Sequence, residues 1–113
     1  MQDVKSVIYP VKDVAHAKVV YSTLFGVAPY ADDPYYVGYK IGDLDIGLDP
    51  SGHGKGMTGP VCYVHVDDIY SSFKALLEAG ALSQQEVMDV GGGTLTALFK
   101  DNDGNLTGLI QRT

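Results

Sequence analysis

The sequence predicts an α+β fold made of two copies of one βαβββ module. Two observations support this prediction. The segment Val11-Lys12-Asp13-Val14 follows an apolar stretch and precedes a helical stretch that ends at Gly26, and Val66-Asp67-Asp68-Ile69 repeats this arrangement before Gly80. The two motifs lie about half of the 113-residue chain apart. One such module has an open sheet face, so two modules are needed to bury it.

The elements of the first half follow from its local pattern. Residues 4–11 are expected to form a strand, and Asp13 is a suitable N-cap for the helix that follows. Gly26 has the character of a residue that ends a helix. Val20, Tyr21 and Leu24 are expected to form one buried stripe of this helix. Short β-type runs separated by turn residues then predict strands at 27–31, 35–41 and 44–48.

The second half repeats this order after a glycine-rich segment at 51–59, which we interpret as the linker between the halves. Asp68 is the expected N-cap, and Gly80 is expected to stop the helix. The predicted strands are 60–66, 82–90, 94–100 and 105–111. The chain is thus predicted to be a single domain, residues 1–113, with module one at 1–58 and module two at 59–113.

Composition excludes several classes of protein. The formal net charge of −6 argues against nucleic acid as a partner, because phosphate-binding surfaces need clustered Lys and Arg. No apolar run is long enough to span a bilayer, so no membrane role is expected. A single cysteine, Cys62, excludes an internal disulfide, and no signal peptide is visible. These features predict a cytoplasmic location.

The chain resembles the vicinal oxygen chelate superfamily, the fold of glyoxalase I, extradiol dioxygenases and bleomycin-resistance proteins. The resemblance covers essentially the whole chain. Its motifs are Val11-Lys12-Asp13 with 20–26 in the first half, and 64–68 with 100–105 in the second. It implies curled mixed sheets around a cleft, and a homodimer as the expected assembly.

The same resemblance raises the question of a metal. Many members of the superfamily hold a divalent ion with one side chain from the first and one from the last strand of each module. The matching positions here are Ser6, Gly47, Val61 and Gly108. Three of the four have no side-chain donor atom, and a lone serine is a poor ligand. We therefore predict no metal and no cofactor. The two glycines either leave room at the cleft or permit the sheet to curl.

Other residues are candidates for lining a ligand site. His65 and Tyr63 share strand parity with Val61 and are expected to face the cleft. Tyr39 is a third candidate; it shares a face with Tyr35, whereas Tyr36 lies on the other. For any single tyrosine, and for His65, plain sheet packing is the alternative. His53, in the linker, is expected to be mobile surface.

The predicted function is metal-free binding of a small molecule, resembling the bleomycin-resistance proteins. A planar or aromatic compound would be sequestered in the sheet cleft. The predicted ligand-binding residues are Ser6, Tyr39, Gly47, Val61, Tyr63, His65 and Gly108. Two alternatives remain open. One is a lyase, isomerase or dioxygenase-like enzyme with a displaced metal site or His/Tyr acid–base catalysis; the other is an accessory protein with a vestigial cleft. Whether the chain is an enzyme is left undecided, with binding favoured.

Overall fold

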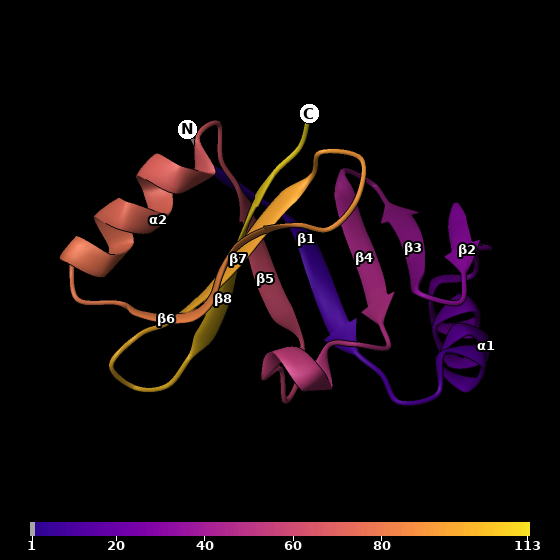
Figure 1. Ribbon diagram of the computed structural model, residues 1–113. Helices are drawn as coiled ribbons and strands as arrows, with labels where there is room; N and C mark the ends of the chain where they lie inside the picture. Colours follow the sequence, from indigo (N-terminus) through magenta and orange to yellow (C-terminus); the bar gives the residue numbers. More distant parts are fainter. Residues whose placement is uncertain (1) are drawn as a thin grey trace. The chain divides into compact units, whose positions relative to one another are not determined.

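The computed structural model describes residues 2–113 (Figure 1). The chain divides into two compact units. The first unit is Lys5–Val61, and the second consists of residues 2–4 with Cys62–Thr113. In each unit one helix packs on a mixed sheet. No helix among the described residues has the length and apolar character needed to cross a membrane.

The first unit contains α1 (Val14–Phe25) and a sheet with the strand order β2-β3-β4-β1. The strands are β1 (Asp3–Pro10), β2 (Ala31–Asp33), β3 (Tyr36–Ile41) and β4 (Leu44–Asp49). β1 runs parallel to β4, and the other pairs are antiparallel. The strand expected at 27–31 is wrong in position, since β2 begins only at Ala31.

The two faces of this sheet differ in composition. α1 covers one face, where Ala17 packs with Val37, Tyr39, Ile46 and Leu48 in the core. The predicted buried stripe of this helix is wrong for Val20 and Leu24, which are 47% and 67% exposed. Because successive strand residues point to opposite sides, their neighbours face away from the helix. We call this second side the helix-free face. In the first unit it carries Ser6, Ile8, Tyr36, Gly38, Lys40, Asp45 and Gly47.

The helix boundaries confirm the predicted capping residues. The Asp13 carboxylate accepts a hydrogen bond from the His16 amide at 3.0 Å. Gly26 ends α1 with a φ of 70°, and its N–H donates to the carbonyl of Ser22. In the second unit the Asp68 carboxylate accepts from the Ser71 amide at 3.2 Å. Each aspartate satisfies an amide that the first helical turn leaves without a partner.

The glycine-rich segment between the two halves is a packed element. It contains a short 3₁₀ helix, η1 (His53–Lys55), and is tied to β4 by Asp49. The Asp49 carboxylate accepts from the Ser51 amide at 2.8 Å and pairs with the Lys55 ammonium at 2.9 Å. Met57 is 1% exposed. Local hydrogen bonds and packing therefore override composition here.

The second unit repeats the topology of the first. It contains α2 (Ile69–Glu78) and a sheet with the order β5-β8-β7-β6, in which β5 is parallel to β8. The strands are β5 (Val61–His65), β6 (Leu82–Asp89), β7 (Leu95–Lys100) and β8 (Leu106–Gln111). α2 packs over Val66, Ala97 and Leu109. The predicted α+β class with two βαβββ modules is thus confirmed.

Candidate functional site

A tyrosine ring covers a glycine on the helix-free face of the first unit. Gly47 on β4 lies beside Gly38 on β3 and Ile8 on β1. A Cβ atom at Gly47 would collide with the Tyr36 hydroxyl and lie 2.7 Å from Ile8 Cδ1. The same ring lies against Gly38, where a Cβ would be 3.1 Å from Tyr36 Cε2. The absence of side chains at these glycines therefore makes room for Tyr36.

The second unit has the same arrangement at the equivalent place. Gly108 on β8 is the register partner of Tyr63 on β5. A Cβ at Gly108 would lie 2.5 Å from Tyr63 Cδ2 and Cε2, and 2.7 Å from Cγ. The ring thus fills the space over Gly108. Close approach of another group is a recognised reason for glycine inside a strand.

The Tyr36–Gly47 and Tyr63–Gly108 contacts decide whether this chain's residues could hold the divalent metal ion that the resemblance suggests. A His, Glu or Gln at position 47 or 108 would need the space that the Tyr36 or Tyr63 ring fills. Val61 offers no donor atom, and Ser6 alone is a poor ligand. Within residues 2–113 no three His, Cys, Asp or Glu side chains are grouped so as to hold a metal ion. The four positions do not fit a metal.

The structure corrects the prediction for Tyr39. Its side chain is fully buried under α1, with its ring centroid 5.2 Å from that of Phe25. The Tyr39 hydroxyl shares a 2.7 Å hydrogen bond with Ser22 Oγ and donates to the Lys18 carbonyl at 3.1 Å. Tyr39 is a core residue on the helix side. Tyr36, three residues earlier and of opposite parity, places its phenol on the helix-free face.

The remaining predicted residues share helix-free faces within their own units. Ser6 and Gly47 do so in the first unit, where Ser6 is 1% exposed. Tyr63, His65 and Gly108 do so in the second, since Tyr63 pairs with Gly108 and His65 with Ile110. Val61 begins β5 and is buried.

A buried carboxylate on the first unit's helix-free face was not among the predicted ligand-binding residues. Asp45 lies opposite Ser6 in the β1/β4 register and is 6% exposed. It accepts from the Tyr30 hydroxyl at 3.1 Å and pairs with the Lys40 ammonium at 3.2 Å. A carboxylate in contact with a phenol and an ammonium can accept or position a proton. Asp45 lies two residues before Gly47 and therefore on the same face of the strand, which could have marked it as a site residue. The turns around it instead favoured a role for this aspartate in backbone hydrogen bonding.

Comparison with solved structures establishes the fold. The chain is similar to a protein from Legionella pneumophila described as an NAD-dependent benzaldehyde dehydrogenase, with a TM-score of 0.79 at 15% identity, covering 96% of this chain and 98% of that one. A glyoxalase/bleomycin resistance protein/dioxygenase superfamily member from Vibrio splendidus gives 0.71 at 14%, covering 99% and 100%. Methylmalonyl-CoA epimerase in complex with methylmalonyl-CoA and ammonium gives 0.75 at 13%, covering 100% and 96%.

These likenesses define a class by fold rather than by chemistry. The chain has the vicinal oxygen chelate fold, shared by glyoxalase/bleomycin resistance superfamily members and methylmalonyl-CoA epimerase. No protein-family model matches the sequence, and no curated protein matches it. At identities of 13–15% the similarity shows the fold alone. Function has to be argued from the residues of the helix-free faces.

Proposed function

We propose that this chain is a small-molecule-binding protein that holds a planar or aromatic compound on its helix-free sheet faces without a metal. The observation that carries the proposal is the pair of tyrosine–glycine contacts, Tyr36 on Gly47 and Tyr63 on Gly108. The family resemblance matches Gly47 and Gly108 to metal-ligand positions, and at both of them a phenol ring fills the space that a ligand side chain would need. A rigid ring with one hydroxyl suits recognition of flat, largely apolar molecules.

Polar groups beside the rings supply orientation in this proposal. Binding sites for small molecules combine an apolar lining with a few well-placed polar atoms. Ser6 and Asp45 lie across from one another on adjacent strands of the first unit. His65 follows Tyr63 on the same face of β5. These side chains would accept or donate hydrogen bonds at the edge of a ring-stacked ligand.

Binding of planar fluorescent probes tests the proposal. Ethidium and 8-anilinonaphthalene-1-sulfonate are titrated into protein treated with EDTA, with fluorescence and thermal stability as readouts. Saturable binding of at least one probe is expected, and a probe at one hundred times its Kd adds about 2.7 kcal/mol of stability. The Tyr36→Leu variant should weaken that binding by roughly tenfold or more, as expected for loss of a stacked ring.

Tyr35→Leu is the matched control. Tyr35 is the neighbouring tyrosine, is 81% exposed and precedes β3, so its loss should leave probe binding unchanged. Equal weakening by both variants, binding that needs an added divalent ion, or no response to either probe would each contradict the proposal.

A second candidate function is proton-transfer catalysis, favoured by one observation. The buried Asp45 carboxylate contacts the Tyr30 hydroxyl, and this acid–base pair lies on the helix-free face. Incubation with methylmalonyl-CoA in D₂O tests the simplest version, since removal and return of the proton next to a thioester carbonyl introduces deuterium. Incorporation that disappears in Asp45→Asn would favour the enzyme; none with the wild-type protein would count against it for this substrate.

A further inference from the structure

One charged group on the helix-free face of the first unit has no counterpart in the second module. Asp45 on β4 pairs in register with Lys40 on β3. At the equivalent place in the second unit, two residues before the glycine that a tyrosine ring covers, Leu106 on β8 pairs with Lys100 on β7. The lysine is present in both modules, whereas the carboxylate is present only in the first. The βαβββ fold therefore does not require an acidic residue at this position.

The Asp45 carboxylate has lost most of its contact with water. Its side chain is 9% exposed, whereas the Lys40 side chain, whose ammonium lies 3.2 Å from it, is 60% exposed. Taking a carboxylate out of water is costly, and a pair with a largely hydrated ammonium recovers little of that cost. A leucine, as in the second module, would avoid the cost. A buried charge that the fold does not require is typical of a functional site.

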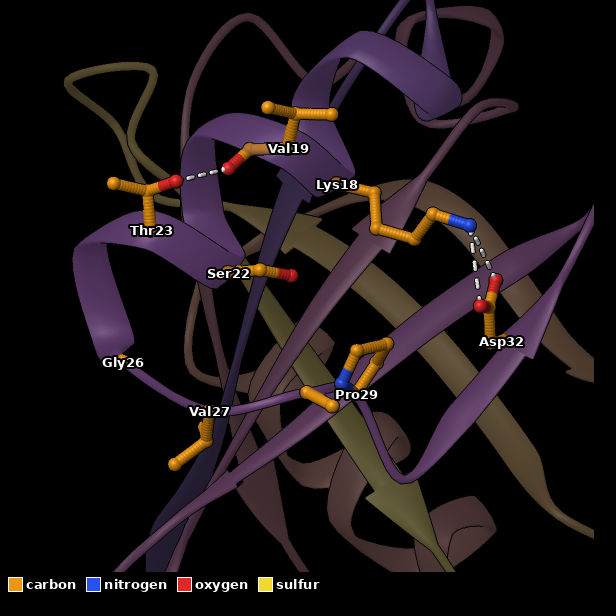
Figure 2. Close-up of a pocket in the computed structure, with 9 residues that line it drawn as sticks. Lys18, Val19, Ser22, Thr23, Gly26, Val27, Pro29 and Asp32 are labelled. Carbon is orange, nitrogen blue, oxygen red and sulfur yellow. Dashed lines mark hydrogen bonds and ion pairs between the residues drawn. The ribbon is translucent and has the colours of Figure 1, made fainter.

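The Lys18–Asp32 ion pair of the same unit provides a contrast. It lies at the groove beside α1, where the Lys18 ammonium reaches both Asp32 carboxylate oxygens at 3.1 Å (Figure 2). The two side chains are 38% and 48% exposed. Both charges of this pair stay in contact with water, as is usual for ion pairs on a protein surface. In the Lys40–Asp45 pair only the cation does so.

Aromatic rings surround the buried carboxylate. The Tyr30 hydroxyl donates a hydrogen bond to Asp45, and the Lys40 ammonium lies over the Tyr30 ring at 6.0 Å from its centroid. A Cβ at Gly38 would lie 3.1 Å from atoms of both the Tyr30 and the Tyr36 rings, so these two rings meet over that glycine. A carboxylate beside aromatic faces is an environment that stabilises an organic cation. In this structure the lysine of the chain itself supplies the cation.

The ammonium at this place can be exchanged for another one. Lys40 holds its charge on a flexible four-carbon stem, and its side chain is more than half exposed, so it can turn out into water at little cost. The Tyr30 ring is also accessible, at 57% exposure. A flat molecule with a protonated nitrogen could therefore reach both the carboxylate and the rings. The net charge of −6 favours the approach of a cation to this chain.

We infer that the first unit's helix-free face recognises a planar organic cation. Its protonated nitrogen takes the place of the Lys40 ammonium beside Asp45, and its rings lie against Tyr30 and Tyr36. Asp45 is then the residue that selects for charge, and Lys40 is a competitor that the bound molecule displaces. This inference rests on the proposed small-molecule function and names the chemical class of its ligand.

Two probes with the same three-ring frame test the inference. 9-Aminoacridine is a cation at neutral pH and acridone is uncharged, and each is titrated into EDTA-treated protein with fluorescence as the readout. The wild-type protein should bind 9-aminoacridine at least roughly tenfold more tightly than acridone, because only the cation pairs with the carboxylate. Asp45→Asn should abolish this preference and leave acridone binding unchanged. Lys40→Gln should tighten 9-aminoacridine binding by roughly threefold or more, because the competing ammonium is gone.

Lys74→Gln is the matched control for net charge. Lys74 is exposed on α2, which packs against the other face of its sheet, so this variant should bind both probes as the wild-type protein does. Circular dichroism establishes that each variant is folded, and Lys40→Gln provides a second route if Asp45→Asn does not fold.

The possible failures can be told apart. Equal affinity of the wild-type protein for the two probes, or a preference that survives Asp45→Asn, would overturn the inference and leave the proposed small-molecule function standing. Weaker binding of 9-aminoacridine by Lys40→Gln would overturn it as well, since the lysine would then assist binding and not compete with it. Binding of neither probe would count against the proposed function itself and overturn the inference with it.

Discussion

Single residues decide what the helix-free faces can do. From the sequence, Gly47 and Gly108 could each either leave room at the cleft or permit the sheet to curl. The structure gives a different reason, because the Tyr36 and Tyr63 rings lie against them. The glycines are therefore required by their neighbours rather than by backbone conformation, since neither has a positive φ.

Substitution of Gly108 by Ala should reduce the free energy of unfolding by about 1–3 kcal/mol, because the new Cβ overpacks the Tyr63 ring. The double variant Gly108→Ala/Tyr63→Ala should lose less than the sum of the two single variants, as expected for residues in contact. Urea denaturation measures all three. Gly54→Ala, where a Cβ meets nothing within 4 Å, is the control. Additive losses in the cycle would show that the ring does not cover the glycine in solution.

The turn between β7 and β8 contains the clearest perturbed carboxyl group. The Asn105 side-chain amide donates to Asp101 at 2.8 Å and, with the Asn105 and Asp103 amides, holds the pKa of Asp101 below its usual value. A lowered folded-state pKa means that this turn's stabilisation is complete above the unfolded-state pKa and is lost as the pH falls through the folded one. Carbon-detected NMR titration should show Asn105→Ala raising the Asp101 pKa. An unchanged pKa would contradict the assignment.

At the scale of elements, strand alternation was predictable but the side of each strand was not. Tyr35 and Tyr39 were expected to share one face and Tyr36 to lie on the other. In the structure Val37, Tyr39 and Ile41 pack towards α1, so Tyr39 is buried under the helix. Alternation along a strand divides its residues into two sets, one on each face of the sheet. The register of β3 against β4, and the position of α1 on the sheet, decide which set is the core.

The segment between the modules is a packed element, and this too is testable. A Cβ at Gly52 would lie 2.7 Å from Pro10 Cβ and 2.9 Å from its Cα. Gly52→Ala should therefore lower the midpoint of thermal unfolding through a backbone clash, with a loss of about 1–3 kcal/mol. Gly54→Ala in the same segment should be nearly neutral. Equal melting of both variants would contradict the close packing of Gly52 against Pro10.

At the scale of the whole molecule, the repeat and the charge are the dominant properties. Both units have one helix on a four-strand mixed sheet with the same order and pairing. Any ligand that approaches the chain meets the electrostatic field of its net charge of −6. Such a charge alters association rates through the long-range field, and salt screens it over about 10 Å at 0.1 M.

Association of a charged probe should reflect that field. Stopped-flow fluorescence should show the on-rate of cationic ethidium falling as salt is added, because screening removes its attraction to the acidic chain. The on-rate of the anionic naphthalene sulfonate should rise under the same conditions. Opposite trends would mean that local charges such as Lys40 dominate the encounter, and rates independent of salt for both probes would mean that the net charge does not steer it.

The sequence by itself determined the two-module α+β fold, the capping aspartates and the lack of donor atoms at three of the four metal-ligand positions, because these depend on local patterns that repeat along the chain. Only the tertiary structure decided that Tyr36 rather than Tyr39 lies on the helix-free face, that Asp45 lies beside Ser6, and that tyrosine rings fill the space over Gly47 and Gly108. The physical reason is that these are contacts between strands distant in sequence. Strand register sets them, and no local pattern encodes it.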